Sequence, residues 1–372
     1  MANEKQDTKL QSVVLPSREK SGSHQAPKTQ RAAVATEHGK GVELRDSEPV
    51  KEPGDDEVLV HVVRTGLCHT DLHALSGDWE VKSKMPLIAG HEGAGYVVKT
   101  GSNVKNLRAG DRVGIKWIHD TCGQCEFCLS GRETVCPNQE RTGFSCDGTF
   151  QEYAVAKATH VVPIPEEVGY DQAASMMCAG VTVYKGLKET EVKPGQWVVI
   201  SGAGGGLGHL AVQFAKAMGM RVIGIDSGTK KDFCSSLGVD IFYDFEETKD
   251  LIQEIIFATT GGAHGALLAV AIPEPYQQAL GYLRSWGTLV TLGLPKKGSI
   301  IPVDIFHTVM RRLTVRGSIV GTRTDAIEAL GFAAQGSVKV HLTLEPMSKL
   351  KEVLEKMEKG EVEGRIVLDT SK

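Results

Sequence analysis

The stretch VVISGAGGGLGHLAVQFAKAMGMRVIGID, residues 198–226, decides the fold, because it predicts a strand, a glycine-rich turn, a helix and a second strand. Apolar residues recur on one face of the helical segment at the spacing of an amphipathic helix, at Leu207, Leu210, Ala211, Phe214, Ala215 and Met218. Gly219 then ends the helix. The unit predicts two parallel strands joined by a crossover helix.

The same alternation continues on the C-terminal side of this unit. Apolar strands are predicted at GQWVVIS (195–201), MRVIGID (220–226), VDIFYD (239–244), GALLAVA (265–271), GTLVTLG (287–293) and RLTVRGS (312–318). Helical stretches separate them. Six strands alternating with helices predict an α/β domain with a doubly wound parallel sheet.

The rest of the chain has a different character. Short strands between Gly and Asn turns are predicted at EVLVHVV (57–63), GAGYVVKTGSNV (93–104) and GDRVGIKWI (110–118). A helix at MSKLKEVLEKMEKG (347–360) and a strand at RIVLD (365–369) follow the parallel sheet. We therefore expect a second domain that is mostly β.

The composition excludes several classes of function. The 372 residues are 41% hydrophobic and 24% charged, with a net charge of −4, which is ordinary for a globular protein of two domains. There is no basic excess for binding nucleic acid. The longest apolar runs are far shorter than the roughly 20 residues that span a membrane. The expected partners are therefore small molecules.

The first 30 residues are mixed in charge and poor in aromatic side chains. Glu4, Asp7 and Glu19 argue against a transit peptide, and the hydrophobic core of a secretory signal is missing. We predict a flexible N-terminal extension over residues 1–30 and a cytoplasmic protein.

The glycine-rich turn predicts a dinucleotide site. Between a strand and a helix, such glycines let the backbone approach a pyrophosphate, and the helix N-terminus offers it free amides. The best register is Ala203-x-Gly205-x-x-Gly208, with Gly202, Gly204, Gly206 and Leu207 completing the loop. A glycine turn without a ligand is the alternative.

Asp226 predicts which dinucleotide binds. It ends the second strand, where a carboxylate accepts hydrogen bonds from ribose hydroxyls and repels a 2′-phosphate. Because we expect no basic partner beside it, Asp226 favours NAD over NADP. A solvated aspartate at a strand end is the alternative.

Four of the eight cysteines lie in CGQCEFCLSGRETVC. Cys122, Cys125, Cys128 and Cys136 can close a tetrahedral zinc site, which has a structural role because no position is open to substrate. An iron–sulfur cluster is the rival interpretation, because thiolates suit both.

The segment GLCHTDLHAL (66–75) concentrates further metal-binding chemistry around Cys68. AGHEGAGYV adds His91 and Glu92, and MMCAGVTVY adds Cys178. A catalytic zinc takes three protein ligands and one exchangeable position. Cys68, His91 and Cys178 could supply them, although their spacing alone does not decide it.

Together these motifs resemble the zinc-dependent medium-chain alcohol dehydrogenases, above all the yeast-type ethanol dehydrogenases of fungi. The resemblance runs from about residue 30 to the C-terminus. It implies a GroES-like catalytic domain over 31–179 and 320–372, with a structural zinc lobe at about 119–138. It also implies a Rossmann coenzyme domain over 180–319 and a homotetramer.

The resemblance also implies a role for each site residue. Cys68, His91 and Cys178 would hold a catalytic zinc, and Cys122, Cys125, Cys128 and Cys136 a structural one, giving two zinc ions per chain. Asp71 would orient His91, and Glu92 would approach the metal when substrate leaves. Thr70 would take the alcohol proton and His73 would pass it to solvent. His69 and Arg365 would contact the pyrophosphate, Lys230 the ribose, and Trp79 and Trp117 the substrate.

Some positions depart from the family. Leu75 replaces a tryptophan and Leu294 a methionine of the yeast enzymes. The exchange at Leu75 removes an aromatic ring near the pocket, which could therefore take larger alcohols. Cys146 and Cys234 have no assigned role. The expected activity is NAD-dependent interconversion of primary alcohols and aldehydes. The alternatives are the same chemistry on a bulkier or aromatic alcohol, and a zinc-stabilised nucleotide-binding protein without catalysis.

Overall fold

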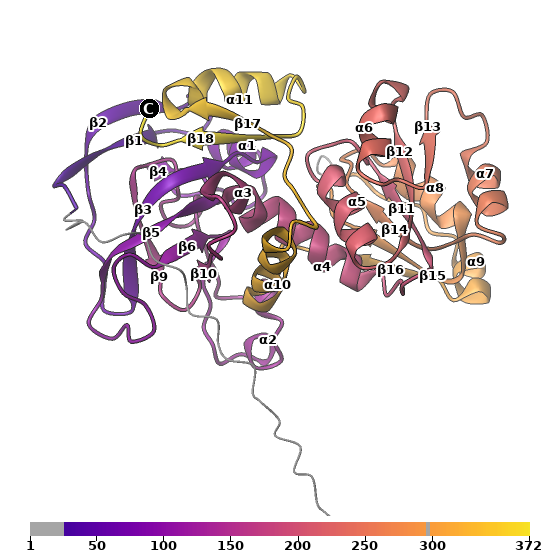
Figure 1. Cartoon of the computed structure of the whole chain (residues 1–372), viewed down its shortest axis with the longest axis horizontal. Helices are drawn as coiled ribbons and strands as arrows, with labels where there is room; N and C mark the ends of the chain where they lie inside the picture. The colour runs from indigo at the N-terminus through magenta and orange to yellow at the C-terminus, as the bar shows by residue number, and fades with distance from the viewer. Residues whose placement is uncertain (1–25, 295–297) are drawn as a thin grey trace, which may run out of the picture.

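The computed structural model describes residues 26–294 and 298–372. Two lobes lie side by side, helix α4 lies between them, and α10 lies beside α4 at the edge of one lobe (Figure 1). Most of the predicted extension lies outside the described residues, but strand β1 (Thr29–Ala35) begins within residues 1–30. Residues 29 and 30 therefore belong to a strand and not to the predicted extension.

One lobe is built on a six-stranded sheet in the order β13-β12-β11-β14-β15-β16, with every pair parallel. Its strands are β11 (Trp197–Ser201), β12 (Arg221–Asp226), β13 (Ile241–Asp244), β14 (Ala263–Leu268), β15 (Leu283–Thr291) and β16 (Thr314–Gly317). The predicted doubly wound sheet is confirmed. Its strand order reverses beside β11, and ligands bind at such a point, outside the carboxyl ends of the strands.

Alternate residues of β11 face opposite layers of helices, because strand side chains alternate with a period of two. Val198 and Ile200 pack in the cluster that contains α5 (Gly208–Ala217) and α4 (Val181–Glu189). Val199 packs instead with α7 (Leu251–Ala258) and α8 (Glu274–Tyr282), on the other face. Both faces of the sheet are therefore buried.

The other lobe is built on a seven-stranded sheet in the order β10-β6-β5-β3-β18-β17, with β9 also paired to β3. Its strands are β3 (Glu57–Gly66), β5 (Gly93–Thr100), β6 (Arg112–Ile115), β9 (Tyr153–Lys157), β10 (Val162–Pro163), β17 (Leu342–Pro346) and β18 (Arg365–Asp369). Because β18 pairs antiparallel with β3, the C-terminal segment completes a sheet begun near the N-terminus.

Smaller elements complete this lobe. They are the sheet β2-β1-β4, with β2 (Glu43–Pro49) and β4 (Leu87–Ile88), the pair β7 (Ile118–Asp120) and β8 (Glu140–Arg141), and helices α1 (His69–Ser76), α2 (Glu126–Leu129), α3 (Tyr170–Ser175) and α11 (Leu350–Glu358). The remaining helices are α6 (Lys231–Ser236), α9 (Ile305–Arg311) and α10 (Arg323–Ala334). Among the described residues, no helix combines the length and apolarity needed to cross a membrane.

Two glutamines tie the lobes together through the segment that enters β17. Gln213 of α5 makes two 2.9 Å hydrogen bonds with the backbone of Lys339, one to the N–H and one to the carbonyl. Gln172 of α3 holds Val340 in the same way, at 2.7 and 3.1 Å. Each amide replaces a neighbouring strand, so helices of both lobes fix the same short stretch of backbone.

Candidate active site

Three separate elements bring the first group of metal-binding side chains together. Cys68 immediately precedes α1, His91 and Glu92 precede β5, and Cys178 lies in a π-helical turn, Met176–Gly180, between α3 and α4. One ligand atom from each of the four lies within 4.8 Å of all the others. Turns of π-helix occur often at functional sites.

Asp71 holds two of these ligands in place. Its Oδ1 accepts a 2.8 Å hydrogen bond from His91 Nδ1, and its Oδ2 accepts a 2.9 Å bond from the Cys68 N–H. Burial disfavours a charged imidazole, but the buried Asp71 carboxylate outweighs it and raises the pKa of His91. Because Nδ1 faces Asp71, Nε2 is left to face the other ligands.

The donor atoms fit a zinc ion. His91 Nε2 lies 3.3 Å from Cys178 Sγ, and the corresponding edge of a tetrahedral zinc site is about 3.6 Å, given the usual Zn–N and Zn–S lengths. Glu92 Oε2 is buried with no hydrogen-bond partner. Burial also raises the pKa of Glu92 to about 7. A cation beside Glu92 would give its buried oxygen a partner and would stabilise the charged carboxylate.

Arg365 connects this group to the glycine-rich turn. Its Nη2 donates to Glu92 Oε1, and both side chains are buried. A Cβ placed on Gly206 would lie 3.3 Å from Arg365 Cδ. The predicted metal site and the predicted pyrophosphate site therefore share this guanidinium, although 273 residues separate Arg365 from Glu92.

The predicted phosphate loop, residues 202–208, joins β11 to α5. Gly202 has φ 78°, a left-handed conformation that favours glycine. At the end of β12, Asp226 Oδ2 accepts a 2.8 Å bond from the Gly204 N–H. The carboxylate that is predicted to bind ribose thus also holds the loop that is predicted to bind phosphate.

Asp226 does have a basic neighbour, contrary to the sequence-based expectation. Lys230 Nζ lies 3.4 Å from Asp226 Oδ1, because the turn after β12 places the two residues one helical turn apart. The lysine is 40% exposed, so solvent weakens its attraction for the carboxylate. The predicted repulsion of a 2′-phosphate is therefore reduced rather than abolished.

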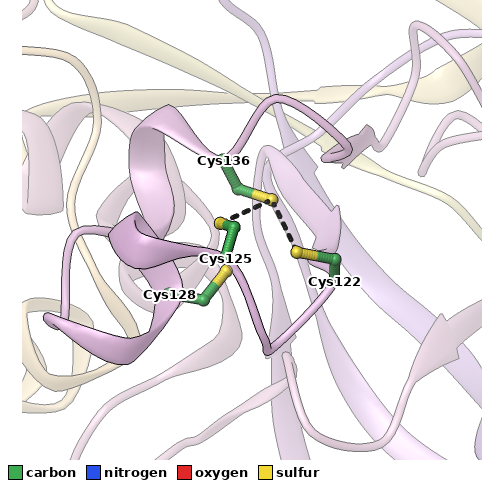
Figure 2. A group of neighbouring side chains, drawn as sticks. All are labelled: Cys122, Cys125, Cys128 and Cys136. Carbon is green, nitrogen blue, oxygen red and sulfur yellow. Dashed lines mark hydrogen bonds between the residues drawn. The ribbon is translucent and has the colours of Figure 1, made fainter.

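The second group is the four-cysteine lobe, Cys122, Cys125, Cys128 and Cys136, whose sulfurs converge within 4.8 Å of one another (Figure 2). Cys136 Sγ lies 3.6 Å from Cys122 Sγ and 3.9 Å from Cys125 Sγ. With Zn–S bonds of about 2.3 Å, a tetrahedral site has sulfur–sulfur edges of about 3.8 Å. A four-iron cluster would bind each thiolate to a different iron and hold them farther apart. The geometry therefore fits a single ion.

Hydrogen bonds connect the four-cysteine lobe to a helix outside it. Glu133 lies between two of the cysteines, and its carboxylate accepts bonds of 2.9, 3.1 and 3.0 Å from the N–H, Nε and Nη2 of Arg323. Arg323 begins α10. Helix α10 in turn contacts α4, which lies between the two lobes of the molecule (Figure 1). The four-cysteine segment therefore supports structure beyond its own loop.

Three aromatic rings pack together beside the first group of metal-binding residues. Trp117 lies edge-on to His91, with ring centroids 5.1 Å apart. Trp79 packs on Trp117 at 6.5 Å, and Phe144 packs on both tryptophans at 5.8 and 5.6 Å. Phe144 was not predicted, because nothing in the sequence around it indicates that it joins the two tryptophans.

The other predicted residues lie in varied surroundings. His69 is exposed and Thr70 half-buried in the first turn of α1. Leu75 is buried in the core cluster that contains Trp117, whereas Leu294 is 58% exposed after β15. Cys146 Sγ donates to the Arg141 carbonyl at 3.4 Å, and Cys234 is fully buried.

His73 has a partner that was not predicted from the sequence. Its Nδ1 lies 3.0 and 2.9 Å from the two carboxylate oxygens of Asp78. The signal was present, since a glycine ends the helix one residue before Asp78. Such a glycine turns the chain back toward the last turn of the helix.

A parallel sheet with a glycine loop at its switch point, next to a largely buried Cys₂His group, defines a class of metal-dependent oxidoreductases. Residues 54–166 match the alcohol dehydrogenase GroES-like domain, and residues 206–335 match the zinc-binding dehydrogenase family. The chain belongs to the family of zinc-binding alcohol dehydrogenases, which confirms the resemblance found in the sequence.

Individual relatives agree with this assignment. An alcohol dehydrogenase of Schizosaccharomyces pombe is 50% identical over 348 residues, covering 93% of this chain and 99% of the relative. The alcohol dehydrogenase of Aeropyrum pernix superposes with a TM-score of 0.82 at 30% identity, covering 91% and 99% of the two chains. Acetophenone reductase of Geotrichum candidum, solved with NAD, gives 0.81 at 28% identity, covering 93% and 98%.

Proposed function

We propose that this protein is a zinc- and NAD-dependent dehydrogenase that interconverts primary alcohols and aldehydes. The observation that carries the proposal is the position of Arg365. It binds Glu92 of the buried Cys–His group and packs against Gly206 of the glycine loop. A metal-bound substrate and a dinucleotide would therefore lie next to each other.

Two zinc ions per chain are part of the proposal. Cys68, His91 and Cys178 would hold the catalytic ion, and the four-cysteine lobe the structural one. When bound, the catalytic zinc supplies a Lewis acid for the substrate oxygen, and NAD supplies the hydride acceptor. The chain's own residues would bind and orient the metal and the substrate, and would move the substrate's proton.

Asp71 has the first of these tasks, because its bond to Nδ1 keeps Nε2 of His91 free to bind metal. Thr70, in the first turn of α1, would accept the hydroxyl proton of the alcohol. His73 is 32% exposed and would release that proton to solvent. The rings of Trp79 and Trp117 would hold the carbon chain beside His91 and exclude water from it.

A panel of alcohols assayed with NAD and with NADP tests this activity, and the zinc content tests the metals. Turnover of short primary alcohols with two zinc ions per chain is expected. The relatives include an acetophenone reductase, which supports an aromatic alcohol as the alternative substrate. A preference for aryl alcohols in the panel would favour this alternative. A folded protein with fewer zinc ions and no turnover would favour the non-catalytic alternative.

The coenzyme preference gives a sharper prediction. With the wild type we expect kcat/KM to be about 10- to 100-fold higher with NAD than with NADP, because Asp226 faces the added phosphate and Lys230 offsets only part of the repulsion. Asp226→Asn keeps an acceptor for the loop N–H and removes the charge. It should therefore bring the kcat/KM values for NAD and NADP closer together. Exposed Asp232→Asn, on α6, is the matched control. Equal kcat/KM values for both coenzymes in the wild type would contradict the assignment.

We further propose that the chain works as a homotetramer in the cytoplasm, with its coenzyme domain over 180–319. Large apolar side chains of α9 and the segment before it are exposed, including Ile305 at 78%, Phe306 at 69% and Met310 at 68%. Exposed apolar side chains that gather on one segment are typical of an interface. Sedimentation analysis measures the size of the assembly.

The cysteines support the cytoplasmic assignment. All eight are free, as is usual in a reducing compartment.

A further inference from the structure

The turn at the end of α1 builds a two-sided holder for the His73 ring. Gly77 adopts φ 68° and ψ 30°, and its N–H donates to the His73 carbonyl at 2.9 Å. This left-handed turn brings the Asp78 carboxylate back to the edge of the imidazole, with both oxygens within 3.0 Å of Nδ1. The next residue, Trp79, stacks on the face of the same ring, with centroids 5.2 Å apart and planes 22° apart.

The carboxylate determines which ring nitrogen of His73 carries the hydrogen. An ionised carboxylate only accepts hydrogen bonds, so neutral His73 must be protonated on Nδ1, and Nε2 keeps its lone pair. Asp78 is suited to this role: burial acts against its charge, but the hydrogen bond and the charge of His73, together with hydrogen bonds from Ser76 and from the Asp78 backbone, lower the pKa of Asp78.

We propose that Asp78 is a positioning residue that fixes the Nδ1–H tautomer of His73 and so makes Nε2 the acceptor of the alcohol proton. The proposal rests on the dehydrogenase function. The step is a proton transfer only: the proton that leaves the substrate hydroxyl by way of Thr70 binds Nε2, the imidazolium is paired with Asp78, and the proton then passes from the ring to solvent. No electrons move in this step, and Asp78 touches no reacting atom.

Trp79 also connects the His73 ring to the metal-binding residues. Its ring contacts His73 on one side and Trp117 on another, and Trp117 lies against His91. The proton outlet and the metal ligand are therefore fixed by one set of packed rings. Because a side chain with 32% exposure would otherwise sample several rotamers, stacking and the carboxylate together keep His73 in one orientation.

The first test does not depend on activity. Nitrogen-15 NMR of histidine-labelled protein distinguishes the two neutral tautomers, and the His73 signal is assigned by its loss in His73→Gln. The expected result is the Nδ1–H form in the wild type and a mixture in Asp78→Asn, because an amide can also donate to Nδ1. An Nε2–H form in the wild type, or an unchanged signal in Asp78→Asn, would overturn the proposal.

The second test is a double-mutant cycle in alcohol oxidation near neutral pH. His73→Gln should slow the reaction by roughly 10²-fold, within the range of general base catalysis. Asp78→Asn should slow it by roughly 3- to 10-fold in the wild type, as expected for one partly exposed charged hydrogen bond, and should have no effect in His73→Gln. Asp46→Asn, an exposed aspartate of β2 paired with Arg31, is the matched control and should leave the rate unchanged.

The outcomes separate the two proposals. An equal loss from Asp78→Asn in both backgrounds would show that Asp78 acts without His73 and would overturn the inference alone. A wild type that oxidises no alcohol would overturn the proposed function, and the tautomer measurement would still decide whether Asp78 sets the state of His73.

Discussion

Cys178→Ser should reduce alcohol oxidation by on the order of 10³-fold while the protein melts close to the wild-type temperature. Metal-ion stabilisation of transition-state charge amounts to several kcal/mol, and about 4 kcal/mol corresponds to this factor. The fold should survive because Cys178 lies in one π-helical turn whose neighbours are buried apolar side chains, and serine is smaller than cysteine. The measurements are kcat/KM, zinc content and the melting temperature.

The control for this variant is Cys146→Ser. Cys146 lies outside both groups of metal-binding residues, and its sulfur donates to a carbonyl that a serine hydroxyl can also reach. It should keep two zinc ions and full activity. Retention of both zinc ions and of activity in Cys178→Ser would contradict its role as a ligand.

Cys125→Ser is expected to act on folding. Structural zinc in small domains contributes roughly 10–16 kcal/mol to folding, and proteins of this kind have net stabilities of only about 5–15 kcal/mol. Even a loss of about 3 kcal/mol would lower the melting temperature by roughly 6–12 °C. The variant should therefore melt far below the wild type, contain one zinc ion and aggregate on heating.

The path of this destabilisation can be followed in the structure. Without the ion, Glu133 would lose the rigid loop from which it binds Arg323, and α10 would lose its contact with the lobe. Protease cleavage near residues 122–136 should appear at temperatures where Cys146→Ser remains intact. If Cys125→Ser were inactive but as stable as the wild type, the roles of the two metal groups would be reversed.

The parts of the fold that the sequence predicts are those with local periodicity. The strand–helix–strand unit at 198–226 could be predicted because apolar spacing and a glycine turn act within 30 residues. The metal-binding side chains could be proposed as groups only because short motifs and a family resemblance connect them. Spacing alone could not place Cys178 beside Cys68, since Cys178 lies in a π-helical turn that is distant from Cys68 in the sequence.

The contacts that were missed are formed by side chains distant in sequence or by turn geometry. Lys230 contacts Asp226 because of a short 3₁₀ turn after β12, which the sequence pattern did not resolve. The Arg365–Glu92 pair joins residues that are 273 positions apart in the sequence. Propensity rules describe neighbours along the backbone, so they predict which elements form better than which charges meet.

The strand β18 sets an order of assembly during synthesis on the ribosome. In β3, residues 57–61 pair with β9, but residues 64–66 pair with β18, and the Leu67 N–H donates to the Ile366 carbonyl. The backbone that leads into Cys68 therefore has no partner on that side until residues 365–369 emerge, after the whole parallel sheet has been made. The four cysteines at 122–136 are local in sequence and can take up zinc while the chain is still growing. The order of the sequence therefore lets a nascent chain bind its structural ion early, whereas the strand that pairs beside Cys68 is made only at the end.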